Sequence, residues 1–279
     1  MNERLLTLLI CPSCGTSPRP SSERCPGCGR TVVGSSGQLD LLDDDSRREA
    51  DRFAAQYRAL RTREGWADST GREDPESGKQ ELWHGRLESV SEAATLLARE
   101  WSSGAKPVVA DIGSGGGWAA RHLRGADVIA FDLLDVSAPS PALAVRADMR
   151  KLPMRSGSVD AVLYSASLHY APVAEVVAEA ARVLRPGGLM VAVDSPIYKD
   201  ARTKAQAAAR SAAYYSGAGY PELSDHYHPI NVVELRAALT ASGFVIERLR
   251  VPSPASRMWL RLARKAPTSL MAARRGALG

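Results

Sequence analysis

Short apolar runs alternate with amphipathic segments over most of the chain. The runs predict strands at 108–112, 127–134, 144–149, 159–167, 189–196 and 244–251. Segments with apolar residues three and four positions apart predict helices at 117–124, 173–184 and 231–243. Several of the strands are apolar at consecutive positions, which is typical of a mostly parallel sheet with helices on both faces. We therefore predict an α/β fold with a Rossmann-like, doubly wound, mostly parallel sheet. We expect seven strands in it, one more than these six runs account for.

All four cysteines lie in the first 28 residues, in two Cys-x-x-Cys pairs that are each followed by glycine. Four thiolates at such spacing close a tetrahedron around a structural zinc ion. The alternative is two disulfides, which a reducing compartment disfavours. We therefore expect a small zinc ribbon whose Zn²⁺ ligands are Cys11, Cys14, Cys25 and Cys28. The metal would supply most of the folding energy of so short a segment.

The regions outside the alternating pattern suggest a division of the chain. Amphipathic helices are predicted at 47–62 and 87–101, with a polar loop at 63–81 between them. An insertion at 198–228 holds five of the eight tyrosines. We expect a zinc ribbon at 1–45, a helical cap and linker at 46–105, a core at 106–252 with the insertion at 198–229, and a basic tail at 253–279.

The net charge of +5 is concentrated at the C-terminal end. Eight basic residues and no acidic one follow Glu247, which leaves 28 basic against 31 acidic residues in the rest of the chain. Residues 255–266 predict a basic amphipathic helix, which would either bind an acidic membrane surface or nucleic acid, or dock its apolar face on the domain. No apolar run reaches the length of a membrane span, and the N-terminus lacks a signal-peptide pattern, so we expect a cytoplasmic protein.

Residues 113–117 hold four glycines directly after a predicted strand. A dinucleotide-binding turn would need a glycine at position 118, where Trp118 stands. Asp111 lies two residues before Gly113, and a carboxylate there disfavours a pyrophosphate but suits a cationic ligand. Asp132 ends the next strand, where a carboxylate can bind both ribose hydroxyls. These features predict a nucleoside with a positively charged appendage, which is S-adenosylmethionine.

Five successive segments resemble the motifs of class I S-adenosylmethionine-dependent methyltransferases, in the same order. They are VVADIGSGGGW, VIAFDL, RADMRKLPMRSGSVDAVLYSASLHY, EAARVLRPGGLMVAV and ELRAALTASGFVIERLRV, and the resemblance covers roughly residues 50–252. It implies methyl transfer, with a cofactor site made of Asp111, Gly113, Ser114, Gly115, Gly117, Asp132, Leu133, Asp148, Met149 and Ser165. Asp148 would receive the adenine amine, or would instead cap a turn.

The cysteine segment resembles the small zinc-ribbon protein that activates translation-related methyltransferases, here fused to the enzyme. Some ribosomal-RNA guanine methyltransferases also carry an N-terminal zinc site. The nucleotide-amine motif Asn/Asp-Pro-Pro-aromatic is absent, and SASLHY occupies its place. This departure from the motif disfavours methylation of exocyclic base amines.

The acceptor side offers a candidate base and an aromatic insertion. His169 and Tyr170 follow the strand at 159–167, where the methyl group is expected; His169 acts either as a general base or as a packing or capping residue. The insertion forms either a lid over a planar or lipophilic acceptor or a packed surface element. His226 and His228 alternatively bind a second metal. The candidate substrate-binding residues are Tyr57, Tyr198, Tyr214, Tyr215, Tyr220, His226 and His228.

Three functions follow from these features. The favoured one is methylation of a small molecule such as a secondary metabolite, a lipid or a quinone-like compound. The second is methylation of rRNA or tRNA, with the zinc ribbon and the basic tail holding the RNA. The third is a non-catalytic protein that binds or regulates a partner, against which the intact acidic and glycine positions argue.

Overall fold

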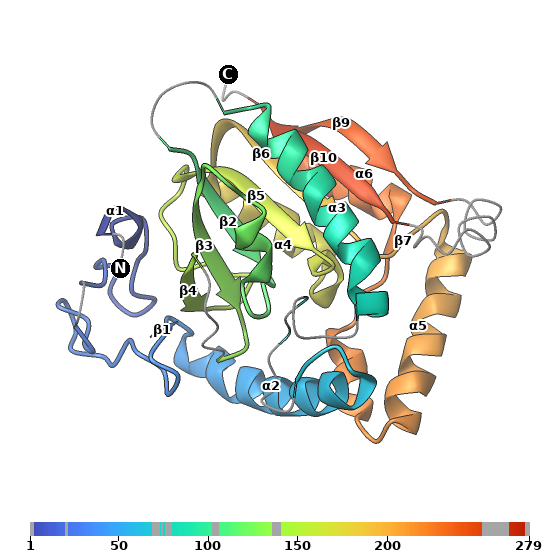
Figure 1. Cartoon of the computed structure of the whole chain (residues 1–279), viewed down its shortest axis with the longest axis horizontal. Coiled ribbons are helices and arrows are strands. Elements are labelled where there is room, and N and C mark those ends of the chain that lie inside the picture. The colour runs from blue at the N-terminus through green and yellow to red at the C-terminus, as the bar shows by residue number, and fades with distance from the viewer. Residues whose placement is uncertain are drawn as a thin grey trace.

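The computed structural model describes residues 3–19, 22–68, 73, 75, 80–101, 106–135, 141–252 and 268–276. Eight strands form its central sheet: β1 (Leu39–Asp40), β2 (Val108–Ile112), β3 (Asp127–Asp132), β4 (Leu143–Arg146), β5 (Val159–Ser165), β6 (Leu184–Val193), β9 (Phe244–Arg250) and β10 (Leu270–Arg275). They lie in the order β1-β4-β3-β2-β5-β6-β10-β9 (Figure 1). The strands from β1 to β6 in that order pair in parallel, and β10 is antiparallel to both of its neighbours. The mostly parallel α/β sheet is therefore confirmed, with eight strands where seven were expected.

The sheet separates two hydrophobic cores because successive strand residues point to opposite faces. In β5, Val162 and Tyr164 join the core with α4 (Val173–Val183) and α6 (Val232–Ala241). Ala161 and Leu163 join the other core, which includes residues of α3 (Gln80–Ala98). Helices thus cover both faces, as the uninterrupted apolar strands predict.

Two strands of the central sheet lie where the sequence predicted none. β10 falls within the segment at 253–279 that we expected to be a basic tail, yet Leu270, Met271, Ala272 and Ala273 are all buried between β6 and β9. The arginines of that segment suggested a solvated tail, whereas its short apolar run completes the sheet. β1 extends the opposite edge. The helix predicted at 255–266 lies outside the described residues.

The N-terminal segment docks against the edge of the sheet (Figure 1). After α1 (Glu3–Leu6), the Ile10 amide donates to the Pro153 carbonyl at 2.9 Å, and Leu9 pairs with Met154 in an antiparallel bridge. The chain then passes through the two cysteine pairs and reaches β1, which pairs with β4.

The long helix α2 (Asp44–Glu64) lies beyond the carboxyl ends of β2 and β3 (Figure 1). It begins at Asp43, whose side chain accepts a hydrogen bond from the Ser46 amide at 2.8 Å. It ends at Gly65, whose φ of 82° is left-handed. One face of α2 therefore covers the strand ends where ligands bind in open parallel sheets.

The insertion folds into a helical arm. β7 (Ile197–Tyr198) and β8 (Ile230–Asn231) pair in parallel and bracket α5 (Ala201–Gly217) and the 3-10 helix η3 (Pro221–His226). Two further 3-10 turns are η1 (Trp118–Arg121), where an α-helix to residue 124 was predicted, and η2 (Leu168–Tyr170). Among the described helices, none is long and apolar enough to cross a bilayer.

Candidate cofactor and acceptor site

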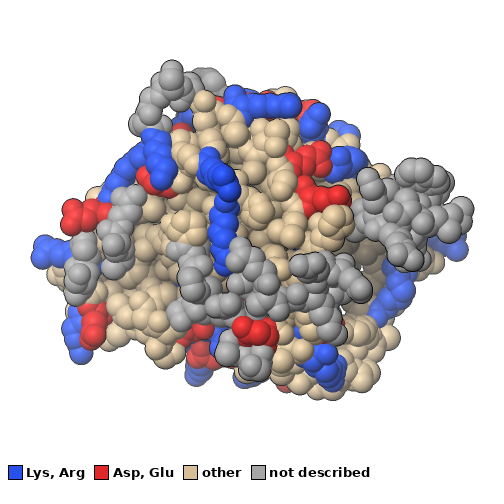
Figure 2. Space-filling model, viewed as in Figure 1, with Lys and Arg blue, Asp and Glu red and all other residues tan. Residues whose placement is uncertain are grey.

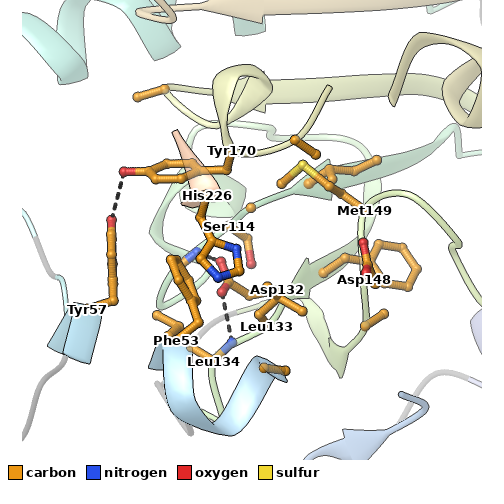
Figure 3. Close-up of a pocket in the computed structure, with 18 of the residues that line it drawn as sticks. Phe53, Tyr57, Ser114, Asp132, Leu133, Leu134, Asp148, Met149, Tyr170 and His226 are labelled. Atoms are coloured by element: carbon orange, nitrogen blue, oxygen red, sulfur yellow. Dashed lines mark hydrogen bonds between the residues drawn. The ribbon is translucent and has the colours of Figure 1, made fainter. Parts of the chain in front are cut away.

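A cleft opens at the carboxyl ends of β2, β3, β4 and β5, between these strand ends and residues of α2 and η3 (Figure 3). Of the residues predicted to bind the cofactor, eight line it: Gly113, Ser114, Gly115, Asp132, Leu133, Asp148, Met149 and Ser165. Next to Ser165 stands Ala166, whose φ of 55° is strained for a residue with a β-carbon. Such strain is often found at functional sites.

The glycine turn is shaped by close backbone contacts. The amides of Gly113 and Ser114 both donate to the Phe131 carbonyl, at 2.8 and 3.0 Å. Gly113 has a φ of 67°, and a β-carbon added there would lie 2.4 Å from Cβ of Ser167. Only glycine therefore fits this position. Gly117 caps η1 with a φ of 69° and lies outside the lining of the cleft.

Asp132, the last residue of β3, is hydrogen-bonded to the glycine turn that follows β2. Its carboxylate accepts a hydrogen bond from the Gly115 amide at 2.7 Å. It accepts another from the Leu134 amide at 2.9 Å (Figure 3). Burial raises the pKa of Asp132 to about 6 despite these bonds. The side chain is thus a fixed acceptor that remains available to hydroxyl donors in the cleft.

Asp111 is fully buried, and neither of its carboxylate oxygens has a partner among the described residues. Burial, together with the charge of Asp132, raises its pKa to about 7. Asp111 does not itself line the cleft, but it precedes the Gly113 turn that does. An unpartnered buried carboxylate is costly and points to a cationic or donor group that is supplied by a ligand.

The other end of the cleft lies between the residues after β3 and those after β4. Leu133, Leu134 and Met149 give it apolar sides (Figure 3). The Asp148 carboxylate accepts three hydrogen bonds from the side chain of Arg150 at 2.6–3.1 Å and one from its amide at 2.8 Å. Asp148 therefore forms the turn that the sequence allowed as an alternative, and it still lines the cleft.

The comparison with known proteins identifies the core of the chain. Residues 110–192 match the family described as a methyltransferase domain. These residues are a methyltransferase domain. An uncharacterized methyltransferase of Mycobacterium tuberculosis is 40% identical over 88 residues, which are 29% of this chain and 36% of that protein. An uncharacterized chloroplastic methyltransferase of Arabidopsis thaliana is 59% identical over 49 residues, which are 17% of this chain and 14% of the relative. The match thus spans about a third of the mycobacterial relative and less of the plant one.

Solved structures share the fold of the methyltransferase domain. One is the complex between the Trm112 methyltransferase activator of Haloferax volcanii and a methyltransferase, with a TM-score of 0.51, 18% identity, and coverage of 71% of this chain and 97% of that chain. Another is geranyl diphosphate C-methyltransferase from Streptomyces coelicolor, with a TM-score of 0.51 and 18% identity. The match covers 68% of this chain and 80% of that chain. At this identity the likeness is one of fold.

An aromatic wall lines the cleft of the methyltransferase domain on the side of α2. Phe53 stacks on Tyr57 at 5.3 Å and lies 4.5 Å from the His226 ring, and Tyr57 meets Tyr170 edge-on at 5.9 Å (Figure 3). Arg61 donates to the Tyr170 hydroxyl at 2.9 Å, and its guanidinium lies 4.8 Å from the centre of the Tyr57 ring. The Tyr170 hydroxyl also donates to that of Tyr57 at 3.5 Å. The rings are held in place and offer flat apolar faces with polar edges.

The structure places His169 outside this wall. It is buried, does not line the cleft, and packs against the rings of Tyr170 and Tyr227 at 4.5 and 5.3 Å. Burial lowers its pKa to about 3, so the imidazole is neutral and a weak proton acceptor. The packing alternative therefore fits His169 better than the role of general base, whereas Tyr170 lines the cleft as expected.

Only part of the predicted substrate set reaches the cleft. Tyr57, His226 and His228 line it, whereas Tyr198, Tyr214, Tyr215 and Tyr220 do not. Tyr215 and Tyr220 pack around Phe53 and Leu60, and the Tyr214 hydroxyl donates to Glu64. These tyrosines connect the insertion to α2, so they support the helix that covers the cleft and do not line the cleft themselves. Among the described residues, the only potential metal cluster is formed by the four cysteines, so the second metal at His226 and His228 has no support.

Several lining residues escaped prediction because they come from segments without a motif. Trp66, Glu73 and Arg86 line the cleft near the glycine turn. The Glu73 carboxylate lies 3.2 Å from the place that a β-carbon on Gly115 would take, and the Arg86 guanidinium lies 4.9 Å from the Trp66 ring centre. A polar loop and an isolated arginine carry no local signal of binding.

The four cysteines converge as their spacing predicts. Their sulfur atoms all lie within 4.8 Å of one another, with Cys11 Sγ 3.8 Å from Cys28 Sγ and Cys14 Sγ 3.5 Å from Cys25 Sγ. The two pairs form matching turns, because the Gly15 amide donates to the Cys11 carbonyl and the Gly29 amide to the Cys25 carbonyl. All four thiols are free, so the disulfide alternative is not formed.

Proposed function

We propose that the protein transfers the methyl group of S-adenosylmethionine to a small-molecule acceptor bound in this cleft. The observation that carries the proposal is the pair of buried carboxylates at the glycine turn, Asp111 and Asp132. Two acidic groups repel the pyrophosphate of a dinucleotide but suit a ligand with hydroxyls at one end and a positive charge at the other. S-adenosylmethionine has that composition.

The residues present fit this cofactor. Asp132 would accept the two ribose hydroxyls, while Leu133 and Met149 would enclose the adenine beside Asp148. The Gly113–Gly115 turn would admit the methionine moiety, whose ammonium would neutralise Asp111 and Glu73 and whose carboxylate would face Arg86. When bound, the cofactor supplies an activated methyl group on a sulfonium. The protein then needs chiefly to align the acceptor and exclude water, which can contribute ~7–11 kcal/mol.

The aromatic wall supports a small acceptor. Phe53, Tyr57, Tyr170 and His226 would hold a planar or lipophilic molecule under α2 and η3, next to Ser165. Basic and acidic side chains are interspersed over the face of the molecule in Figure 2, whereas an RNA-binding face typically gathers basic ones. The name of the S. coelicolor enzyme gives geranyl diphosphate, a small molecule, as what that protein methylates.

A transfer assay tests the proposed acceptor class. The full-length protein is incubated with S-adenosylmethionine labelled in its methyl group, together with the metabolite and RNA fractions of the source cells. We expect label in one or a few small molecules and none in RNA. Label in RNA that disappears steeply between 50 and 200 mM salt would contradict the small-molecule assignment and support the RNA alternative.

Asp111 provides a test based on pH. The folded state keeps its proton up to about pH 7, whereas the unfolded state releases it near pH ~3.9, so this group lowers stability as the pH rises from ~4 to 7. Asp111→Asn removes that cost. We expect its melting temperature to exceed that of the wild type by several degrees at pH 8 and by much less at pH 5, with weaker binding of S-adenosylhomocysteine. Equal melting temperatures at pH 8 would contradict the buried charge.

We also propose that the four cysteines hold a structural Zn²⁺. Zn–S bonds of ~2.3 Å in a tetrahedron require sulfur atoms ~3.8 Å apart. The sulfur distances of 3.5 and 3.8 Å meet that requirement. All four positions would be protein ligands, which suits a structural site and leaves no open position for catalysis.

A further inference from the structure

The hairpin that leaves the ribbon is continuous with the cysteine turns. The Cys25 amide donates to the Arg30 carbonyl at 2.8 Å, and Val32 bonds on one side to Glu23 and on the other to Asp40, each at 2.9 Å. Val33 then pairs with Leu39 in an antiparallel bridge, and the Gly34 amide closes the tip by donating to the Gln38 carbonyl at 2.8 Å. Backbone hydrogen bonds thus connect the tip of the hairpin to the ribbon.

That tip touches the segment that follows Asp132. The side-chain amide of Gln38 donates to the Leu134 carbonyl at 3.0 Å. The hydroxyls of Ser35 and Ser36 both donate to the Asp135 carboxylate. These bonds hold the two residues next along the chain from Leu133, which lines the cleft.

A buried arginine, Arg146, also hydrogen-bonds to the segment that follows Asp132. Arg146 donates from Nε to the Leu133 carbonyl at 2.8 Å and from Nη1 to Asp40 of β1 at 3.3 Å. The exposed fractions of Arg146 and Asp40 are 5% and 4%. Arg146 also pairs with Asp51, and Asp40 also pairs with Arg47, so four charged groups form one network that specifies the contact between β1 and β4.

The N-terminal segment also binds a second part of the chain, residues 153–155, beside the end of the cleft that Asp148 and Met149 line. In addition to the bond from Ile10 to Pro153, the Arg155 amide donates to the Leu8 carbonyl at 2.9 Å. Residues 153–155 follow Asp148 and Met149 closely along the chain. The two segments that would enclose the adenine are therefore both attached to the N-terminal segment.

We propose that the hairpin at 33–39 is a clamp that positions the cofactor loop at 132–135, so that the ribbon sets the affinity of the cleft for the adenosine half of its cofactor. Ser35, Ser36 and Gln38 are its positioning residues, since they lie outside the lining of the cleft and act through Leu134 and Asp135. The Leu134 amide in turn bonds the Asp132 carboxylate. The inference rests on the proposed cofactor.

The test compares two double variants of the full-length, zinc-loaded protein by calorimetric titration with S-adenosylhomocysteine. Ser35→Ala with Ser36→Ala is expected to weaken binding about 5- to 10-fold, because both hydrogen bonds to Asp135 are lost. Ser13→Ala with Ser22→Ala is the matched control, because Ser13 accepts from Arg30 and Ser22 donates to the Arg24 carbonyl, both within the ribbon and away from residues 132–135 and 153–155. The control is expected to change affinity less than about twofold.

Two further readouts separate positioning from general stability. Ser35→Thr with Ser36→Thr keeps both hydroxyls and is expected to bind S-adenosylhomocysteine with an affinity within about twofold of that of the wild type. Removing zinc with a chelator should weaken binding of S-adenosylhomocysteine to the wild type about tenfold. The same treatment should weaken its binding to the Ser35→Ala, Ser36→Ala protein less than about threefold, because that protein has already lost the hydrogen bonds between the hairpin and Asp135.

The outcomes distinguish the clamp from the proposed function. Wild-type protein that fails to bind S-adenosylhomocysteine would overturn the proposed function, and the clamp with it. Wild-type binding that the Ser35→Ala, Ser36→Ala pair leaves unchanged would overturn the clamp alone. Equal sensitivity of both proteins to zinc removal would likewise show that the ribbon does not act through the hairpin.

Discussion

Asp132→Ala is expected to weaken binding of S-adenosylhomocysteine about 100-fold. The substitution removes the acceptor for two ribose hydroxyls, and charge-assisted hydrogen bonds contribute ~1.5 kcal/mol or more each, or ~3 kcal/mol together. It also frees the amides of Gly115 and Leu134, which Asp132 holds at 2.7 and 2.9 Å. Calorimetric titration measures the change directly.

Two variants control this result. Asp132→Asn keeps one acceptor oxygen and is expected to lose about tenfold in affinity, between the wild type and the alanine variant. Asp160→Ala removes a carboxylate at the opposite end of the sheet, which accepts from the Val108 amide at 2.7 Å and pairs with Arg185. It should lower stability and leave affinity unchanged. An Asp132→Ala protein that binds as tightly as the wild type would remove this residue from the site.

Cys25→Ser is expected to reduce the zinc content from about one equivalent per chain to near zero. A hydroxyl is a poor substitute for one of four thiolates, and so small a ribbon depends on its metal for folding. The amide of Gly29, which bonds the Cys25 carbonyl at 2.9 Å, should lose its protection from hydrogen exchange. Elemental analysis and exchange mass spectrometry provide the two measurements.

Ser22→Ala serves as the control for the cysteine variant, because it alters the same ribbon and keeps all four thiols. It should retain its zinc. A Cys25→Ser protein with a full equivalent of zinc would contradict the metal site, and the sulfur atoms within 4.8 Å of one another would then need another explanation.

The sequence predicts the site best where a motif fixes the backbone. The Gly113 turn and Asp132 lie where they were expected, because the carboxyl ends of neighbouring parallel strands meet at one edge of the sheet. The Cys-x-x-Cys-Gly turns are equally local, and the four sulfurs converge as predicted.

Features that depend on the tertiary fold were predicted less well. His169 stands in the right segment, but packing turns its ring away from the cleft. Tyr214, Tyr215 and Tyr220 were expected to contact the substrate, yet they contact α2 instead, while Arg61 of that helix lines the cleft without having been predicted. Strand β10 was not predicted, because the arginines of its segment suggested a solvated tail although four of its residues are apolar and buried. Its place between β6 and β9 depends on pairing between residues that are distant in sequence.

The most direct test of the whole account is a crystal structure of the protein with S-adenosylhomocysteine. We expect the ribose hydroxyls within hydrogen-bonding distance of the Asp132 carboxylate, the adenine between Leu133 and Met149, and the amino group at the Gly113 turn near Asp111. A cleft occupied by a dinucleotide, or the nucleoside bound elsewhere on the molecule, would contradict it.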